Sequence, residues 1–491
     1  METSFYNGLE RYKAQKAVVD DTGVTLTYED LENFAKKIGE LLPKRSLAFC
    51  YCENTAGSLC SYIGCLYNSV VVLLLNRSID KELNQELLNR YKPSFIFTPV
   101  EDREIFSDYS DMCKEYGYIL LERGNKTEIC LHDDLALLLT TSGSTGSPKL
   151  VKQSFSNIQS NAKAIAEYLE LDREERPITT LPMNYTYGLS IINSHLQVGA
   201  TICMTTKGIL QKEFWEFFNQ QQATSFGGVP YTYEMLKKLR FFGMKLPSLR
   251  TMTQAGGKLP PKLHREFAQY AKEQGKRLVV MYGQTEATAR MAYLPYEKSL
   301  EKYGSMGIAI PGGKFELIDV DGNVITASDT VGELVYYGPN VTLGYAEGLE
   351  DLKIGDERKG KLVTGDMAKR DEDGYYYIVG RKKRFLKIFG NRVNLDECER
   401  MLHTEFVQNE CACGGIDDKL CIYYTGSSMR GQSPISHDSN TGQGEELGKK
   451  MEQFLSHKTG LHPSAFVSIQ VEEIPKNDAG KILYKELPTI G

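Results

Sequence analysis

The sequence predicts an α/β protein with a large N-terminal region and a small α+β domain at its C-terminal end. From about residue 26 to residue 379, helical segments alternate with short apolar runs, as in layered helices and sheets. Residues 304–380 hold short Gly- and Tyr-rich strands separated by turns, which predict a smaller β subdomain built from hairpins. A basic run at 381–384 opens a tail with its own pattern. We therefore expect an N-terminal core over 1–381 and a C-terminal domain over 382–491.

The expected elements of the core are short apolar strands and one well-delimited helix. The strand candidates are apolar runs bounded by polar or turn residues, namely Ser46–Cys50, Val70–Leu75, Ser94–Thr98, Leu135–Thr140, Ile178–Leu181, Ala200–Met204 and Leu278–Met281. A helix is expected over Pro261–Gln274, because proline suits a first turn and Gly275 suits the residue after the last. In the tail, one helical face collects the apolar residues Leu395, Cys398, Met401 and Leu402. The polar stretch Gly426–Gly444 predicts a long loop.

Composition narrows the class of protein. The chain has 491 residues, 41% hydrophobic and 25% charged, which is ordinary for a globular enzyme of several domains. A net charge of −6 argues against non-specific nucleic-acid binding. The start of the chain shows no signal peptide, and the longest apolar run, residues 70–75, is too short to span a membrane. The eleven cysteines lack zinc-ligand spacing and predict reduced, buried thiols, so we expect a cytoplasmic protein.

The most informative segment is Thr140–Lys149, which follows the apolar run 135–139 and is rich in hydroxyls, with two glycines and a lysine. Glycines let backbone N–H groups approach phosphate oxygens, hydroxyls donate further hydrogen bonds, and the lysine adds positive charge. The spacing is not that of a Walker A loop. Taken alone, the segment fits a flexible surface loop equally well.

Further polar motifs follow at strand ends downstream. Tyr282-Gly283-Gln284-Thr285-Glu286 offers a ring to stack on a base, a glycine for close approach, and oxygens for phosphate and magnesium. Gly256-Gly257 follows another short strand, and Asp366 could accept hydrogen bonds from two ribose hydroxyls. Gly380-Arg381, the segment 387–393 and the segment 477–482 complete the series.

These motifs, in this order, resemble those of the adenylate-forming superfamily of acyl-CoA synthetases, peptide-synthetase adenylation domains and luciferases. The similarity covers nearly the whole chain. It implies two sheet subdomains and a β-barrel-like part in the N-terminal region, with a small, mobile C-terminal domain. It also implies Mg-ATP-dependent activation of a small carboxylic acid as an acyl-adenylate.

The resemblance assigns a role to each motif residue. The residues expected to bind the phosphates of ATP are Thr141, Ser142, Gly143, Ser144, Thr145, Gly146 and Lys149. Tyr282 and Gly283, with Gly256 and Gly257, flank the adenine, and Asp366 and Arg381 bind the ribose. Thr285 touches the α-phosphate, while Glu286 and Thr145 face magnesium. Lys481 is the expected catalytic cation, because it can contact both anionic reactants at once.

The same resemblance implies a second half-reaction that passes the acyl group to a thiol after the C-terminal domain turns. Lys383 is the matching hinge, and Lys387 would replace Lys481 at the active site. Gly390 and Arg392 fit the acyl-CoA synthetase pattern and favour CoA as acceptor. A phosphopantetheine thiol on a separate carrier protein is the close alternative.

The acid pocket is expected from the segment 181–188, where Tyr185 guards the carboxylate. Amino-acid-activating relatives usually carry aspartate at the next position, whereas this chain has Thr186, so an α-ammonium group would stay unpaired. We therefore expect an aryl or aliphatic acid. The remaining pocket residues are expected to be Tyr187, Gly228, Val229, Thr253, Ala255 and Met281. Two departures from the family pattern, Ala479 and Tyr484, concern the docking of the C-terminal domain.

Other classes of protein stay open at this point. A phosphotransferase would release ADP, whereas adenylation releases pyrophosphate and AMP. A non-enzymatic nucleotide-binding regulator fits less well, because Lys481 and Glu286 are both present. The motifs by themselves also admit a luciferase-like oxygenase.

Overall fold

The computed structural model describes residues 3–125, 129–140, 149–389, 391–416, 418–426, 441–476 and 482–488. Internal contacts divide the chain into two compact units. Unit 1 comprises Met1–Glu316, Val335–Leu362 and Asp373–Tyr377, and unit 2 comprises Leu317–Leu334, Val363–Glu372 and Ile378–Gly491. Each unit is described by itself. The domain boundary near residue 382 stays a prediction.

Unit 1 contains a nine-stranded sheet whose order is β16-β15-β14-β13-β12-β10-β11-β1-β2. In chain order its strands are β1 (Lys16–Asp20), β2 (Thr25–Thr27), β10 (Pro177–Ile178), β11 (Ile202–Met204), β12 (Ser225–Gly228), β13 (Thr251–Gln254), β14 (Arg277–Tyr282), β15 (Ala292–Tyr293) and β16 (Ile308–Ala309). The strands from β14 to β1 pair in parallel, so their carboxyl ends meet at one edge. In such sheets, ligands bind outside the carboxyl ends of the strands.

An eight-stranded sheet of unit 1 has the order β19-β9-β8-β4-β3-β5-β7-β6. Its strands are β3 (Leu47–Cys52), β4 (Val71–Asn76), β5 (Phe95–Pro99), β6 (Tyr109–Glu115), β7 (Tyr118–Arg123), β8 (Leu135–Thr140), β9 (Leu150–Ser154) and β19 (Gly344–Ala346). Here β5, β3, β4 and β8 are parallel. The edge strand β19 comes from far along the chain and pairs antiparallel with β9, which brings residues near 345 beside Lys149.

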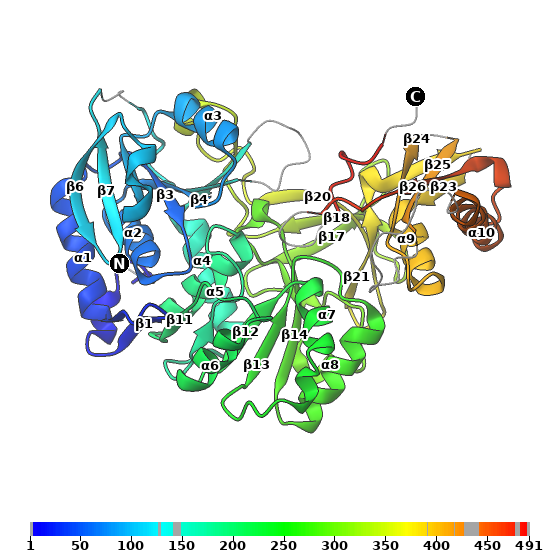
Figure 1. Ribbon diagram of the computed structural model, residues 1–491, viewed down its shortest axis with the longest axis horizontal. Helices are drawn as coiled ribbons and strands as arrows, with labels where there is room; N and C mark the ends of the chain where they lie inside the picture. The colour runs from blue at the N-terminus through cyan, green and yellow to red at the C-terminus, as the bar shows by residue number, and fades with distance from the viewer. Residues whose placement is uncertain are drawn as a thin grey trace. The chain divides into compact units, whose positions relative to one another are not determined.

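Helices cover both sheets of unit 1 (Figure 1). They are α1 (Tyr28–Leu41), α2 (Ala56–Tyr67), α3 (Lys81–Tyr91), α4 (Phe155–Tyr168), α5 (Thr186–Gln197), α6 (Lys212–Gln220), α7 (Pro230–Lys238) and α8 (Pro261–Glu273). Helices α1 and α4 each begin with a capping box, in which Thr27 and Ser154 exchange hydrogen bonds with the third helical residue. The largest apolar core joins residues of α1, α2, α4 and α5 to strands of both sheets.

The β subdomain is a four-stranded sheet of order β17-β18-β20-β21, and the division between the two units runs through it. Its strands are β17 (Lys314–Ile318), β18 (Gly332–Tyr337), β20 (Lys361–Arg370) and β21 (Tyr376–Arg381). Short 3-10 helices punctuate the chain: η1 (Leu9–Tyr12), η2 (Val100–Ile105), η3 (Phe241–Gly243), η4 (Thr285–Ala287), η5 (Tyr296–Lys298), η6 (Leu349–Lys353), η7 (Lys382–Arg384) and η8 (Pro463–Ala465).

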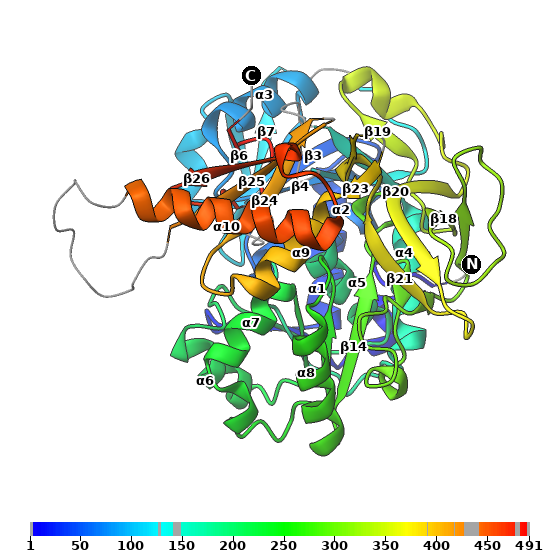
Figure 2. The same cartoon turned by 90° about the vertical axis from the view of Figure 1, so that its right-hand side faces the viewer.

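The C-terminal part of unit 2 is α+β, as the sequence predicts. A hairpin of β22 (Phe385–Ile388) and β23 (Asn391–Asn394) leads into α9 (Leu395–Glu405), and β24 (Cys411–Ile416), β25 (Lys419–Thr425) and β26 (Phe466–Val471) form a sheet. Figure 2 shows α9 and α10 (Thr441–Thr459) lying across this sheet. Their apolar core includes Leu395, Cys398 and Leu402, three of the predicted helical face, with Met401 packed against it.

Most predicted elements are confirmed to within two residues, and two predictions are wrong. The strand expected over Ile178–Leu181 ends at Ile178. Beyond it the backbone no longer pairs as a strand with its neighbours, and the Thr180 hydroxyl donates a hydrogen bond to the Gly227 carbonyl. The loop expected up to Gly444 ends earlier, because α10 begins at Thr441. All eleven cysteines are free and nine are buried, whereas Cys130 is exposed. Among the described residues, no helix is both long and apolar enough to cross a bilayer.

Candidate functional site

Lys149, the last residue of the predicted phosphate loop, lies directly before β9. Residues 141–148 of that loop are outside the described residues. The Lys149 ammonium pairs with Glu347 at 2.8 Å and lies 4.6 Å from the centroid of the Tyr345 ring. The strand pairing of β9 with β19 therefore holds this cation beside an aromatic face.

Glu286 lies in η4, a few residues after β14, and its carboxylate is fixed by Tyr345. The Tyr345 hydroxyl donates a hydrogen bond of 2.7 Å to Oε1 of Glu286. Arg358 places its guanidinium 4.7 Å from the same ring. Burial, with the Glu286 charge as the next cause, raises the pKa of Tyr345 to about 12, so the phenol keeps its proton and serves as the donor.

The backbone of Glu286 is held as firmly as its side chain. Its carbonyl oxygen accepts hydrogen bonds from the Thr342 N–H at 3.0 Å, the Thr342 hydroxyl at 3.0 Å and Nη1 of Arg358 at 3.1 Å. Three donors on one carbonyl fix the position of the 3-10 turn against the segment that precedes β19. The carboxylate is thereby positioned before any ligand arrives.

These residues fit magnesium and a nucleotide phosphate. Oε2 of Glu286 makes no hydrogen bond to a described residue, so one carboxylate oxygen is available as a hard ligand. Within the described part of the chain, no group of three or more His, Cys, Asp or Glu side chains could hold a metal by itself. Magnesium is usually bound through one or two carboxylates together with phosphates of the substrate. A single carboxylate, linked to Lys149 through Tyr345, therefore fits magnesium bound together with substrate phosphates better than it fits a structural metal site held by protein ligands alone.

Gly256 follows β13 and borders both the predicted adenine site and the predicted acid pocket. It has a φ of +81°, and a Cβ atom there would lie 2.8 Å from the Tyr185 hydroxyl and 3.0 Å from Val229. Only glycine allows the backbone to pass this close to Tyr185. A Cβ at Gly257 would lie 3.0 Å from Pro230.

The predicted acid-pocket residues come together in one apolar cluster of unit 1. Tyr187, Val229, Ala255 and Met281 belong to it, and Tyr185 packs against it. The hydroxyls of Tyr187 and Thr253 lie 2.9 Å apart, and a Cβ at Gly228 would meet Thr232 at 2.9 Å. Residues from four separate segments therefore meet in this cluster.

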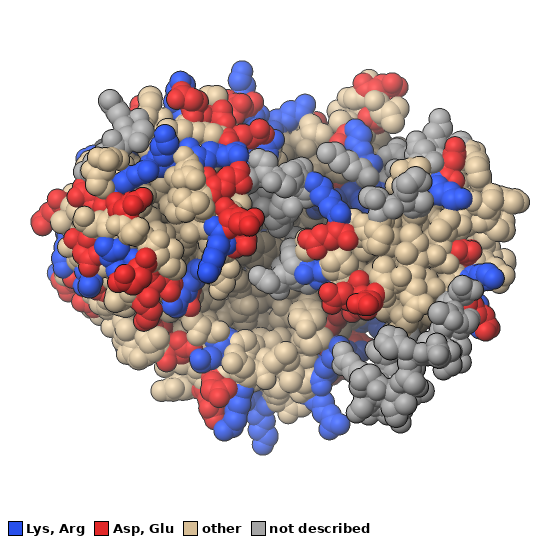
Figure 3. All heavy atoms as spheres, turned by 45° about the horizontal axis from the view of Figure 1, so that its top comes forward, with Lys and Arg blue, Asp and Glu red and all other residues tan. Residues whose placement is uncertain are grey.

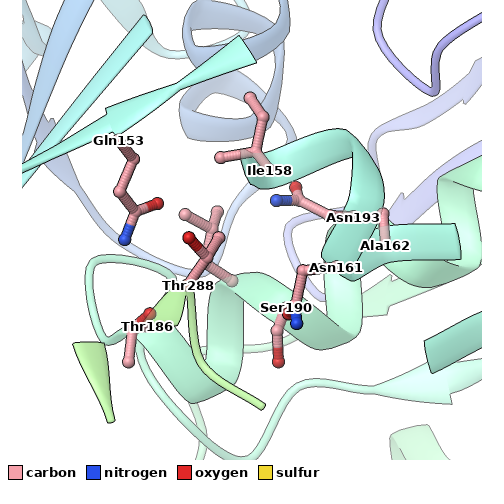
Figure 4. Close-up of a pocket in the computed structure, with 9 residues that line it drawn as sticks. Gln153, Ile158, Asn161, Ala162, Thr186, Ser190, Asn193 and Thr288 are labelled. Atoms are coloured by element: carbon pink, nitrogen blue, oxygen red, sulfur yellow. The ribbon is translucent and has the colours of Figure 1, made fainter. Parts of the chain in front are cut away.

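Next to this cluster is a small, partly open cavity of about 10 Å³, close to the space that one water molecule needs. Figure 4 shows that side chains of α4 and α5 converge on it, together with Gln153 and Thr288. Thr186, the first residue of α5, lines the cavity and brings no negative charge to it. The buried Oδ1 atoms of Asn161 and Asn193, which also line it, have no hydrogen-bond partner.

Unit 2 brings the two predicted ribose residues together. Asp366, on β20, is 4% exposed, and its carboxylate pairs with Nε of Arg381 at 3.2 Å. The Asp366 N–H donates to the Thr364 hydroxyl, which itself donates to the Leu334 carbonyl. Gly365, which lies between them within β20, has a φ of +71°, a backbone conformation that glycine adopts without strain.

Several predicted residues cannot be placed in full. Gly390 and Lys481 lie outside the described residues. Lys383 lies in η7, and Lys387 and Arg392 face each other in the register of the β22–β23 hairpin, but only their backbone is described. Thr285 begins η4, and Tyr282 and Gly283 lie at the end of β14 as expected. The structure adds residues that sequence reasoning missed: Tyr345, Arg358 and Arg290.

Known proteins share this arrangement over nearly the whole chain. The profile of the AMP-binding enzyme family matches residues 5–346. A 2-succinylbenzoate–CoA ligase of Oceanobacillus iheyensis is 27% identical over 488 residues, covering 96% of each protein. The O-succinylbenzoate coenzyme A synthetase of Bacillus subtilis in complex with AMP has a TM-score of 0.78 at 21% identity, covering 99% of this chain and 98% of that one. ATP-bound MatB from Rhodopseudomonas palustris has a TM-score of 0.77 at 20% identity, with the same coverage.

A carboxylate held in place after β14, a lysine just ahead of β9 and an apolar cluster that contains tyrosines are together the features of a nucleotide-dependent, acid-activating enzyme. The chain belongs to the family of AMP-binding enzymes, and it is of the acyl-CoA synthetase type. The resemblance read from the motifs is thereby confirmed.

Proposed function

We propose that this chain is an ATP-dependent, AMP-forming ligase that joins a small carboxylic acid to CoA. In the first step, a carboxylate oxygen of the acid attacks the α-phosphorus of ATP, and pyrophosphate leaves. In the second step, the thiol attacks the acyl carbon, and AMP leaves with the bonding electron pair. Glu286 and Thr145 would hold magnesium, which would offset phosphate charge when bound.

One observation carries the proposal: the residues for the nucleotide and those for the acid converge on the turn that follows β14. Glu286 is tied to Tyr345, whose ring also contacts Lys149, and Glu286 and Lys149 are residues predicted for magnesium and the phosphates. Met281, just before the turn, belongs to the acid cluster around Tyr187. The 2-succinylbenzoate–CoA ligase reported above matches this chain over 96% of its own length, which supports CoA as the acceptor.

The acid lacks an α-ammonium group, because Thr186 and the other described residues of the acid cluster supply no carboxylate to pair with one. We propose an aryl or aliphatic acid. On the face in Figure 3, basic and acidic side chains are interspersed, which supports small-molecule partners over nucleic acid. The free cysteines support a reducing compartment, the cytoplasm.

The test is a panel of carboxylic acids assayed for pyrophosphate and AMP, each with and without CoA. The panel includes 2-succinylbenzoate, simple aryl and aliphatic acids, and standard amino acids. We expect pyrophosphate with an aryl or aliphatic acid, and a CoA thioester when CoA is present. Release of ADP would contradict adenylation, and adenylate that passes only to a carrier protein would contradict CoA as acceptor.

A further inference from the structure

Arg290 is a buried cation that contacts residues of the apolar acid cluster. Its side chain is among the largest that are fully enclosed, with 1% of the residue exposed. Nε donates to the Ser190 hydroxyl at 3.2 Å, Nη1 donates to the Tyr168 hydroxyl at 3.1 Å, and the guanidinium carbon lies 4.7 Å from the Tyr187 ring centroid. Nη2 is buried and has no hydrogen-bond partner.

No carboxylate among the described residues pairs with this guanidinium. The titratable groups that face it are Tyr168, Tyr185, Tyr187 and His195. Burial raises the pKa of each tyrosine and lowers the pKa of His195 to about 4, so all four are uncharged near neutral pH. Arginine keeps its proton in proteins, and a buried charge without a counter-charge is costly. The protein therefore retains a positive charge that its own described residues do not balance.

The backbone that presents Arg290 is strained. Thr288 and Ala289 both have positive φ values, 51° and 87°, in residues that are not glycine. A Cβ at Gly283 would lie 1.5 Å from the Ala289 carbonyl oxygen, so the turn closes against a glycine. The Asn340 amide donates to the carbonyls of Ala287 and Arg290, at 2.7 and 2.9 Å. Strain that is held in this way is typical of functional sites.

The location relates Arg290 to the acid and not to the nucleotide. Its neighbours Tyr187 and Met281 belong to the apolar acid cluster, and Tyr168 packs against that cluster. Glu286, the predicted magnesium ligand, precedes the strained residues in sequence, whereas Arg290 follows them. We propose that Arg290 binds a second anionic group of the acid, so that the substrate is a dicarboxylic acid whose distal carboxylate neutralises this guanidinium.

This inference rests on the proposed function and narrows its substrate class. A guanidinium presents a planar set of donors that matches a carboxylate, and burial strengthens the pair. A monocarboxylic acid would commit its single carboxylate to the α-phosphate and leave Arg290 unpaired. A distal carboxylate takes no part in adenylation and can therefore pair with Arg290.

The test compares straight-chain and aryl dicarboxylic acids with their half methyl esters, with pyrophosphate release as the readout. In the unaltered enzyme we expect the best diacid to exceed its half ester in kcat/KM by about 10- to 100-fold, the range for one charge-assisted hydrogen bond. Arg290→Met should abolish or reverse this preference, and Arg290→Lys should keep part of it. ATP binding should be unchanged in both variants.

Arg45→Met is the matched control, because Arg45 is also partly buried and donates to carbonyls, but is remote from the acid cluster. It should keep the diacid preference even if it lowers stability. If Arg290→Met does not fold, the comparison in the unaltered enzyme still decides.

A half ester that serves as well as its diacid would overturn the inference and leave the proposed function standing. An equal loss for both acids in Arg290→Met would assign Arg290 to the reacting carboxylate and also overturn it. Failure of every acid to release pyrophosphate would overturn the proposed function together with the inference.

Discussion

The Tyr345 hydroxyl donates a 2.7 Å hydrogen bond to Oε1 of Glu286, and the Tyr345 ring lies near the cations of Lys149 and Arg358. One aromatic side chain thus links the predicted magnesium ligand to the predicted phosphate lysine. The tyrosine orients Glu286 and holds Lys149 nearby, so its role is to position both groups.

Tyr345→Phe should weaken the binding of Mg-ATP by about tenfold, because it removes one hydrogen bond to a carboxylate while keeping the ring. The effect should depend on magnesium, since the lost bond acts through Glu286. Calorimetric titration of ATP, with magnesium and with EDTA, measures both. Exposed Tyr303→Phe is the control. An equal loss in EDTA would mean that Tyr345 acts on the nucleotide without the metal.

Asp366→Asn should weaken nucleotide affinity by about 10- to 100-fold with little change in kcat at saturating ATP, because ribose binding is made before and during the reaction. The carboxylate is buried and already paired with Arg381 at 3.2 Å. Fluorescence titration with an ATP analogue measures the change, and exposed Asp108→Asn serves as control. Unaltered affinity would show that the ribose assignment is wrong.

His264 should make the stability of unit 1 fall as the solution is acidified. The ring is buried, accepts a hydrogen bond at Nδ1 from the Gly304 N–H, and has the Ser299 hydroxyl 3.0 Å from Nε2. Burial lowers the pKa of His264 from 6.5 to about 4. A depressed pKa contributes stability above pH 6.5 that is lost as the pH falls toward 4.

The loss for His264 amounts to about 3 kcal/mol between pH 7 and pH 4. His264→Gln keeps a polar side chain that does not titrate, so its melting temperature should vary less with pH than that of the unaltered protein. The exposed His462 provides the control, as His462→Gln should leave the pH profile unchanged. Parallel profiles for all three proteins would rule out His264 as the source.

The sequence predicts those features that depend on local pattern. β8 is predicted at both ends, because an apolar run meets a polar glycine loop at Thr140. β14 is longer than predicted by one residue at each end, because Arg277 and Tyr282 are polar yet continue the ladder. Motif order also locates Glu286 shortly after β14, whereas Asp366 lies within β20 and not at a strand end.

Residues that act through distant partners escape this reasoning. Tyr345 and Glu286 are 59 positions apart and meet only because β19 joins β9. Arg290 and Tyr168 are 122 positions apart. The available signal for Arg290 was a lone charge within the apolar segment Ala289–Ala292, but its lack of a counter-charge becomes visible only once its neighbours are known.

Tyr484, a departure from the family pattern, has a structural explanation within unit 2. Its ring centroid lies 3.7 Å from the guanidinium carbon of Arg384, and its hydroxyl donates to Oε2 of Glu399 at 2.9 Å. Arg384 also pairs with Asp396 and Glu399. The end of the chain is thereby tied to α9 and to the residue that follows the predicted hinge, Lys383.

That tie bears on the last prediction, in which the two half-reactions are separated by mutation. Lys481→Ala should abolish adenylate formation, because it removes the cation that bridges two anions. It should spare thioester formation from a supplied acyl-adenylate, in which the acyl–phosphate bond already exists.

Lys383→Pro should spare adenylate formation and impair thioester formation, because proline fixes φ near −65° and stiffens the hinge. The adenylate should then accumulate without reaching CoA.

Both half-reactions are measured in both variants, by pyrophosphate release for the first and by thioester formation from supplied adenylate for the second. Lys382→Ala is the control for the hinge, because it alters the neighbouring residue, whose ammonium pairs with Glu333 at 2.7 Å, without restricting φ. It should leave both steps within about twofold of the unaltered enzyme, as expected for a partly exposed ion pair. Equal loss of both steps in each variant would mean that no rotation about Lys383 links them, and a single arrangement of the C-terminal domain would then have to serve both reactions.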